Sequence, residues 1–433
     1  MQSDSQVIHV PRRSALIDQL ARANRQAWVL LAVEVLLIVL VGIFIDWNWV
    51  VQQPIMATIA IGYMVRPFGY SLLIQAAQKK TRIQDLREST RFGQYDKHRL
   101  LALYRDTLHR LRLSDDSLSV YITAGRSINA GALHVGLGSV FKWFNGIFLN
   151  RQTLHKLEPA ELQDIIGHEL GHYYKHYLVI DRFRIVTLTL GSLLAIFVVQ
   201  RFGLANILGY FILICVPLVV WKLSGLPHAR NAHAIEYLCD DFGAQVGGVM
   251  PSINGLLKLG QSAEIECAVL QQAVLSKIAG NFNPMELVET VLSSIPYGHA
   301  TRDEVEAQVN RSLRERAANQ KMSLGGLFHY MWNSDTDAEA AEELEEQAKR
   351  LAKLQFVPRL DWESLLQDPT QVQFSEDGVR ALVEMIAEHP EHELFRIPDV
   401  MDPSLDSHPP LKSRILYLWF NRAEIESQLR TRV

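Results

Sequence analysis

The sequence predicts a mostly α-helical membrane protein with a small β element, an α+β chain with about four transmembrane helices. Long apolar runs separated by polar stretches carry this prediction, and one alternating segment, residues 118–122, supplies the β element. The mean hydropathy is +0.03, which averages these two kinds of sequence. The chain has 433 residues, more than the roughly 100 to 200 of one domain, so we expect several structural units.

The N-terminal apolar runs are predicted to form the first pair of membrane helices. Residues 27–45 have the length that a helix needs to cross a bilayer and carry one charge, Glu34. Residues 54–74 form a weaker run, because Arg66 and Pro67 interrupt it. For each run the alternative is a helix buried in a soluble core.

Two later runs, residues 185–200 and 202–221, are separated only by a tight turn and are predicted to form a helical hairpin. The first of them is short. Arg184 and Arg201 at its two ends can extend their charged groups to the membrane interface, so a short run can still cross.

Basic residues indicate the orientation of both hairpins. Arginines and lysines cluster before the first run and after the second, whereas the connection at residues 46–53 has none. Basic residues also flank the later hairpin, and its tip carries only Arg201. Because cytoplasmic loops are enriched in Lys and Arg, we expect the N-terminus and both flanks of the later hairpin to be cytoplasmic.

These runs divide the chain into seven predicted segments. The soluble parts differ in pattern, since the region before the later hairpin mixes helical and alternating segments and the region after it is mostly helical. The segments are an N-terminal cytoplasmic stretch 1–26, a membrane hairpin 27–76, the first half of a soluble domain 83–182, a second membrane hairpin 185–221, the second half of that domain 224–300, a helical insert of unassigned role 301–400 and a C-terminal segment 401–433.

Charge and cysteine content exclude several classes of protein. The chain has 43 Lys and Arg against 47 Asp and Glu, a formal net charge of −4, which gives no support to a nucleic-acid partner bound through phosphate contacts. Its 3 cysteines form no CxxC pair, so neither a disulfide framework nor a cysteine-rich zinc module is expected.

The sequence IGHELGH at residues 166–172 contains the motif HExxH. Residues four apart lie on one face of a helix, so His168 and His172 can present both imidazoles to one zinc ion. Glu169 points to the side, where it can take a proton from a water molecule. A catalytic zinc site usually needs a third protein ligand.

Glu236 is the preferred third ligand. By spacing alone it is an ordinary helix residue, but two predicted membrane crossings separate it from His172, so both return to the same compartment. Asp240 lies one helical turn after Glu236 and can accept the free N–H of a ligand histidine.

Other candidates for the third ligand fit less well. The metzincin pattern needs Gly and His where Lys175 and Leu178 stand. His176 lies one turn beyond His172, too far along an unbroken helix to join the same ion. Cys239 could supply a thiolate, but three residues after Glu236 it is more typical of a small buried residue.

The order of these motifs resembles the integral-membrane zinc metallopeptidases of the HtpX and CAAX prenyl protease type. HExxH, a hydrophobic hairpin and ExxxD follow two N-terminal membrane segments. Residues 120–122, then Asn129 and Ala130, resemble the family's edge strand, which binds substrate backbone by strand addition. SHPPLKSRI at residues 407–415 is similar to the family's His-Pro-Pro segment, which makes His408 a candidate for stabilising the oxyanion. His299 opens a weaker echo of that segment, without the intact Pro-Pro.

The resemblance implies a gluzincin-like metallopeptidase domain that binds one zinc ion per chain. It implies a membrane-embedded endopeptidase whose substrates are membrane-associated or misfolded proteins or peptides. The expected location is the bacterial inner membrane, with the active site on the cytoplasmic side.

Two departures from the family's pattern motivate an alternative. His233 stands where the family usually has Arg, and Cys239 where it usually has Ala, so that ExxCDD is closer to BlaR-type sensor metallopeptidases. The alternative function is a sensor or regulatory peptidase that acts on a dedicated partner or on itself. A sensor predicts an extracellular ligand-binding domain, and none of the loops predicted outside is long enough for one. A catalytically inactive scaffold would need a broken HExxH, and this motif is complete.

Overall fold

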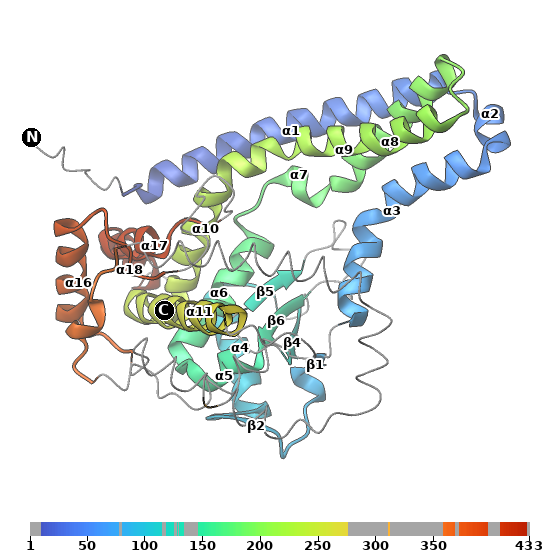
Figure 1. Ribbon diagram of the computed structural model, residues 1–433. Coiled ribbons are helices and arrows are strands. Elements are labelled where there is room, and N and C mark those ends of the chain that lie inside the picture. Colours follow the sequence, from blue (N-terminus) through green and yellow to red (C-terminus); the bar gives the residue numbers. More distant parts are fainter. Residues whose placement is uncertain are drawn as a thin grey trace, which may run out of the picture.

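The computed structural model (Figure 1) is mostly helical, in agreement with the predicted class, and its described residues include a small mixed sheet of four strands and an antiparallel pair of two short strands. It describes residues 10–77, 80–114, 118–124, 128, 130–133, 146–275, 311, 358–368, 372–396 and 408–430.

Three helices within the described residues are long and apolar enough to cross a membrane: α1 (Arg13–Phe44), α8 (Arg184–Arg201) and α9 (Ile207–Ser224). They run side by side as a bundle at the top of Figure 1. Many large apolar side chains on α1 and α9 are exposed, as expected of surfaces that face lipid. The predicted first, third and fourth runs therefore coincide with candidate membrane helices.

The predicted second run belongs to α3 (Pro54–Ala77), which follows the short helix α2 (Trp47–Gln52). The helix continues through Arg66 and Pro67, where the sequence pattern suggested an interruption. Its apolar described part, Pro54–Arg66, is shorter than the three candidate spans. Four crossings therefore remain a prediction.

Helix α1 extends well beyond the predicted membrane run. It begins at Arg13, so the predicted N-terminal stretch is mostly the start of one helix of 32 residues, about 48 Å long at 1.5 Å per residue. Leu16, Leu20 and Ala23 are buried in the core of the soluble part. Arg13 pairs with buried Asp241 at 2.5 Å. The first candidate membrane helix is thus anchored directly to the domain formed by α10 and the C-terminal helices.

Glu34 lies buried where α1 meets α8 and α9. Thr187 of α8 donates a hydrogen bond to one carboxylate oxygen at 2.9 Å, and Ser224 of α9 donates to the other at 2.6 Å. An acidic residue in a membrane bundle is costly unless it faces the interior and finds partners. The single charge in the first apolar run therefore joins three helices.

The sheet has four strands in the order β1-β4-β6-β5. Strands β4 and β6 are parallel, and the other two pairs are antiparallel. Alternate side chains Val120, Ile122, Ile147 and Leu149 are buried, which matches the predicted alternation. The strands are β1 (Lys80–Arg82), β4 (Ser119–Thr123), β5 (Ala130–Leu133) and β6 (Gly146–Asn150).

Two helices, α6 (Pro159–Tyr174) and α10 (Leu226–Gly247), form the centre of the soluble domain and pack unusually closely. A Cβ on Gly167 would lie 2.9 Å from the Cα of Gly243, and a Cβ on Gly243 would lie 2.5 Å from the carbonyl oxygen of Asp164. Only glycine permits backbones to approach this far. The close approach brings the side chains of α6 and α10 within reach of one another.

The C-terminal part packs against α10 and α11 (Val249–Leu275) in one core that also holds the start of α1. Residues 358–396, predicted as part of a separate insert, share this core through Trp362, Phe374 and Phe395. The helices here are η4 (Trp362–Leu365), α16 (Glu376–Glu388), α17 (Leu411–Phe420) and α18 (Arg422–Arg430).

The remaining short elements complete the soluble domain: η1 (Ile83–Asp85), β2 (Arg91–Phe92), β3 (Tyr95–Asp96), α4 (Lys97–Arg110), α5 (Arg151–Lys156) and α7 (Val179–Arg182).

Candidate active site

Helix α6 carries the HExxH motif, and its start is locally encoded. Glu158 and Glu161 form a reciprocal capping box around the first turn, and Pro159 occupies the first helical position. The residues around Pro159 therefore fix where the helix begins. The helix continues without a break to Tyr174, so His168 and His172 lie on one face. Glu169, between them in sequence, is 9% exposed.

His168, His172 and Glu236 form a compact cluster whose ligand atoms all lie within 4.8 Å of one another. The two histidine Nε2 atoms are 3.1 Å apart. The Glu236 oxygens lie 3.5 Å from Nε2 of His168 and 3.3 Å from Nε2 of His172. Ligands 2.0 to 2.1 Å from a tetrahedral zinc ion lie about 3.4 Å from one another. The contact distances of 3.1 to 3.5 Å between these side chains are therefore close to the separations found among zinc ligands.

The environment of Glu236 also fits a cation. The residue is 6% exposed, and its Oε2 atom has no hydrogen-bond partner among the described residues. Burial raises the pKa of this carboxyl, but His172, His168 and Arg414 outweigh burial and hold the pKa well below its usual range. A buried carboxylate oxygen without a donor is costly, and a metal ion between the histidines would satisfy it.

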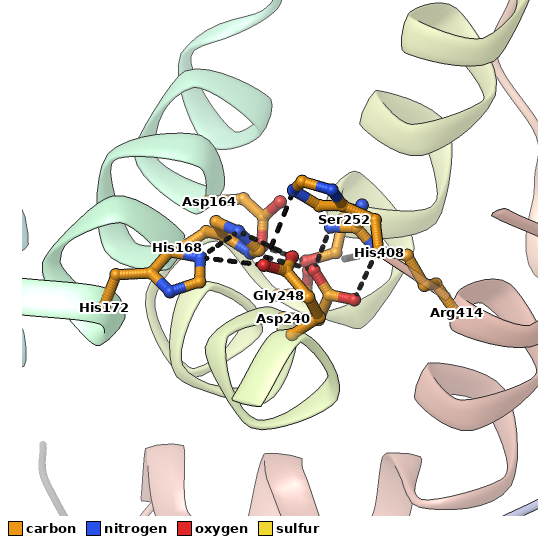
Figure 2. A network of polar contacts seen from close by, with 9 residues as sticks. Asp164, His168, His172, Asp240, Gly248, Ser252, His408 and Arg414 are labelled. Atoms are coloured by element: carbon orange, nitrogen blue, oxygen red, sulfur yellow. Dashed lines mark hydrogen bonds and ion pairs between the residues drawn. The ribbon is translucent and has the colours of Figure 1, made fainter. Parts of the chain in front are cut away.

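Asp240 orients His168. Its Oδ1 atom lies 2.9 Å from Nδ1 of His168, and a carboxylate can only accept, so we assign the proton to Nδ1. Nε2 is then the free ligand atom, directed toward His172 and Glu236. Figure 2 shows this contact within a wider polar network.

Arg414, on α17, forms a bidentate ion pair with Asp240 from the opposite side. Its Nε donates to Oδ2 at 2.7 Å and its Nη2 to Oδ1 at 2.5 Å. The side chains are 9% and 4% exposed. Burial raises the pKa of the Asp240 carboxyl, but Arg414 and His168 together hold it below its usual value. Asp240 is therefore a fixed anion that links α17 to His168 on α6.

Asp164, one turn before His168, belongs to the same network. It accepts a hydrogen bond from Ser252 of α11, and both residues appear in Figure 2. Burial raises the pKa of the Asp164 carboxyl to about 7. Helix α6 thus carries, one turn before His168, a buried carboxyl group whose pKa is raised toward neutral pH.

His408 approaches the cluster from the segment before α17. Its Nε2 atom lies 3.5 Å from Oε1 of Glu236, and its side chain is 54% exposed. A partly exposed imidazole beside the ligand triangle is in a position to meet a bound substrate. Figure 2 shows it on the side of the network opposite His172.

The predicted substrate-binding pair lies at the limit of what the structure describes. Asn129 and the weaker candidate His299 lie outside the described residues. Ala130 begins β5, the edge of the sheet among the described strands, and β5 contacts α6. Strand β4, which the resemblance suggested as the edge, is instead an interior strand between β1 and β6.

Two other histidine and cysteine candidates are not part of the ligand cluster. His176 is 6% exposed and lies edge-on to Phe242 at 5.8 Å. Cys239 is fully buried, and burial raises the pKa of its thiol to about 11, so it is not the thiolate that zinc prefers. The thiol instead hydrogen-bonds to His172.

Sequence reasoning missed the roles of Arg414 and Cys239. Arg414 belonged to the quoted C-terminal segment, and an arginine close behind His-Pro-Pro was the available signal. Cys239 was visible as a departure from the family's alanine. The partners, Asp240 for Arg414 and His172 for Cys239, are evident only from the packing of α10 against α6 and α17.

The family comparison agrees with this geometry. Residues 102–250 match peptidase family M48. The chain contains an M48 peptidase domain. The matched range includes the HExxH helix, the later hairpin and Glu236, and it supports a metallopeptidase of the HtpX and CAAX prenyl protease type. Neither a curated protein nor a solved structure matches the chain.

Proposed function

We propose that the chain is a membrane-embedded zinc endopeptidase that cleaves membrane-associated or misfolded proteins. His168, His172 and Glu236 would hold one zinc ion per chain. The observation that carries the proposal is the convergence of these three side chains. The two histidine Nε2 atoms lie 3.1 Å apart, Oε1 of Glu236 lies 3.3 Å from Nε2 of His172, and Oε2 lies 3.5 Å from Nε2 of His168. Among the described residues, that buried Oε2 atom has no hydrogen-bond donor. An M48 peptidase domain over residues 102–250 supports the same reaction class.

Bound zinc supplies a Lewis acid that lowers the pKa of water to about 7 and polarises a peptide carbonyl. Glu169 accepts the proton of the attacking water and then passes it to the leaving amine. Its place directly after His168 on the same helix supports this role. Asp240 and Arg414 hold His168 in the tautomer that leaves Nε2 free.

His408 stabilises the negative charge that develops on the carbonyl oxygen. Its half-exposed ring beside Glu236 supports this role, because a donor must reach the oxygen from the substrate side. Asn129 and Ala130 bind the substrate backbone as an added strand. The edge position of β5 and its contact with α6 support this assignment.

We place the active site at the cytoplasmic face of a bacterial inner membrane. The Arg13 end of α1 contacts α10 beside the ligand cluster, which supports one compartment for the N-terminus and the site. The distribution of basic residues supports the cytoplasmic side.

The test compares the full-length protein in detergent with its Glu169→Gln variant. We expect the variant to bind zinc as the parent does and to lose cleavage of an unfolded protein and of a model membrane protein. Glu158→Gln, at the start of the same helix, is the matched control and should retain activity. A Glu169→Gln protein that cleaves at the parental rate contradicts the mechanism.

A further inference from the structure

We infer that His389, Glu391 and His392 form a second site for a divalent transition-metal ion. These residues follow α16 on a turn and share no ligand with the candidate active site. Their ligand atoms all lie within 4.8 Å of one another, as do those of the catalytic triangle. Two imidazoles and one carboxylate are the donor set that Zn²⁺, Ni²⁺, Co²⁺ and Cu²⁺ accept.

The three side chains already converge. The Glu391 Oε1 atom lies 3.4 Å from Nε2 of His392 and 3.9 Å from Nδ1 of His389. The two imidazole rings are stacked, with centroids 5.1 Å apart and planes 13° from parallel. To reach the separation of about 3.4 Å found around tetrahedral zinc, the widest pair, which lies within 4.8 Å, must close by at most about 1.4 Å. Exposed side chains make such a movement by small rotations.

The backbone that carries these ligands is held at both ends. On one side His389 ends α16, and its N–H donates to the carbonyl of Met385 at 3.1 Å. On the other side Glu393 exchanges backbone hydrogen bonds of 2.9 Å with the strand-like residues Pro358 and Leu360. Leu394 and Phe395, which follow directly, are 1% and 2% exposed. The ligands therefore project from a fixed turn.

Lys412 of α17 stabilises the middle of the turn through hydrogen bonds. Its ammonium group donates to the carbonyls of Pro390 at 2.9 Å and His392 at 2.8 Å, and it lies 3.4 Å from Oε1 of Glu393. Lys412 is 8% exposed. A buried lysine that binds two turn carbonyls keeps the turn in one conformation, which lowers the entropy that a metal ion must overcome on binding.

The site is open to solvent, which favours an ion that exchanges readily. The side chains of His389, Glu391 and His392 are 51%, 61% and 32% exposed. Three protein ligands leave further positions to water, so the ion exchanges with the medium more readily than one in a closed site of four ligands. The site is thus suited to an accessory ion that stabilises the C-terminal unit.

Helix α17 connects this site to the candidate active site. Lys412, which holds the turn, and Arg414, which holds Asp240, lie two residues apart on α17. An ion that fixes the turn therefore also stabilises the docking of α17, because a ligand that binds only the folded form raises its stability.

The test measures zinc per chain in the detergent-solubilised full-length protein, equilibrated with free Zn²⁺ and analysed by mass spectrometry under native conditions. The parent should bind two zinc ions and the double variant His389→Asn/His392→Asn one. The control His98→Asn removes a single exposed histidine beside Glu88 and should retain two. The variant His168→Asn should lose the other ion and keep the one bound on the turn.

Thermal unfolding provides a second readout. Without added metal, the parent and the double variant should unfold at the same temperature, which shows that the turn is intact. Added Zn²⁺ or Ni²⁺ should raise the midpoint of the parent more than that of the double variant. One zinc ion in the parent, or a second ion that survives in the double variant, would overturn the inference.

Discussion

Replacing Arg414 by methionine tests whether the C-terminal helix supports the zinc-ligand helix. Methionine keeps most of the length and apolar volume of the side chain and removes the guanidinium. Asp240 then loses both hydrogen bonds from Arg414 and stays buried with one remaining partner, His168. The side chains of Arg414 and Asp240 are 9% and 4% exposed, so water cannot replace the guanidinium as a partner of the Asp240 carboxylate.

The expected loss of stability follows from this burial. Removing one member of a buried ion pair costs about 3 to 5 kcal/mol. Because His168 still contacts Asp240, we expect the lower end, about 3 kcal/mol. For a domain of about 150 to 250 residues each kcal/mol lowers the unfolding midpoint by about 2 to 4 °C, so the midpoint should fall by about 6 to 12 °C. Zinc affinity should fall about 10- to 100-fold, as when other orienting partners of ligand histidines are removed.

The assay combines thermal unfolding of the zinc-free protein with zinc competition against a chromogenic chelator. Arg422→Met is the matched control, because Arg422 begins the next helix and pairs with Glu426 and Glu376 at the surface. It should cost less than about 1 kcal/mol and leave zinc affinity unchanged. If Arg414→Met behaves like this control in both measurements, the linkage from α17 through Asp240 to His168 is refuted.

Three further predictions concern single side chains. Cys239→Ala removes the hydrogen bond to His172, so zinc affinity should fall by up to about tenfold, and Cys239→Ser should restore part of it in the same chelator assay. Burial lowers the pKa of His176 to about 3 from 6.5, so the folded form binds fewer protons than the unfolded form between these values. The contribution of neutral His176 to the free energy of unfolding is fully present above pH 6.5. Below that pH the free energy of unfolding should decline by at most about 1.4 kcal/mol per pH unit because of this residue. The free energy of unfolding of His176→Gln, measured against pH, should lack this part of the decline. Glu34→Ala removes two hydrogen bonds between membrane helices and should cost about 2 kcal/mol in detergent, whereas Glu34→Gln should cost less than half as much; equal midpoints for the two would contradict the role of Glu34.

The local part of the site could be predicted because helix geometry is set by the sequence nearby. The spacing of His168 and His172 places both on one face of any α-helix, and Glu158 and Pro159 mark where that helix begins. The apolar runs likewise indicate helices by length and composition alone. Glu236 was preferred as the third ligand because of the even number of predicted crossings, since its spacing alone is that of an ordinary helix residue.

Contacts between distant segments could not be predicted in this way. Arg414 and Asp240 are 174 residues apart, and no local rule pairs them. The burial of α1 beside α10 was also missed. Residues 13–26 show only a polar pattern, and the sequence does not reveal that their apolar side chains pack against α10. The order of strands, which makes β5 rather than β4 the edge, depends on pairing across the whole sheet.

The sequence by itself indicated the metallopeptidase reaction class, through a motif whose residues must lie together on one helix, and it indicated candidate membrane helices, through long apolar runs. Only the tertiary structure decided which residues support that motif. The glycines that let α6 and α10 approach one another, the arginine behind Asp240 and the turn that presents His389 and His392 each depend on surfaces far apart in the chain. Such surfaces meet because burying apolar area and pairing buried charges are properties of the whole fold.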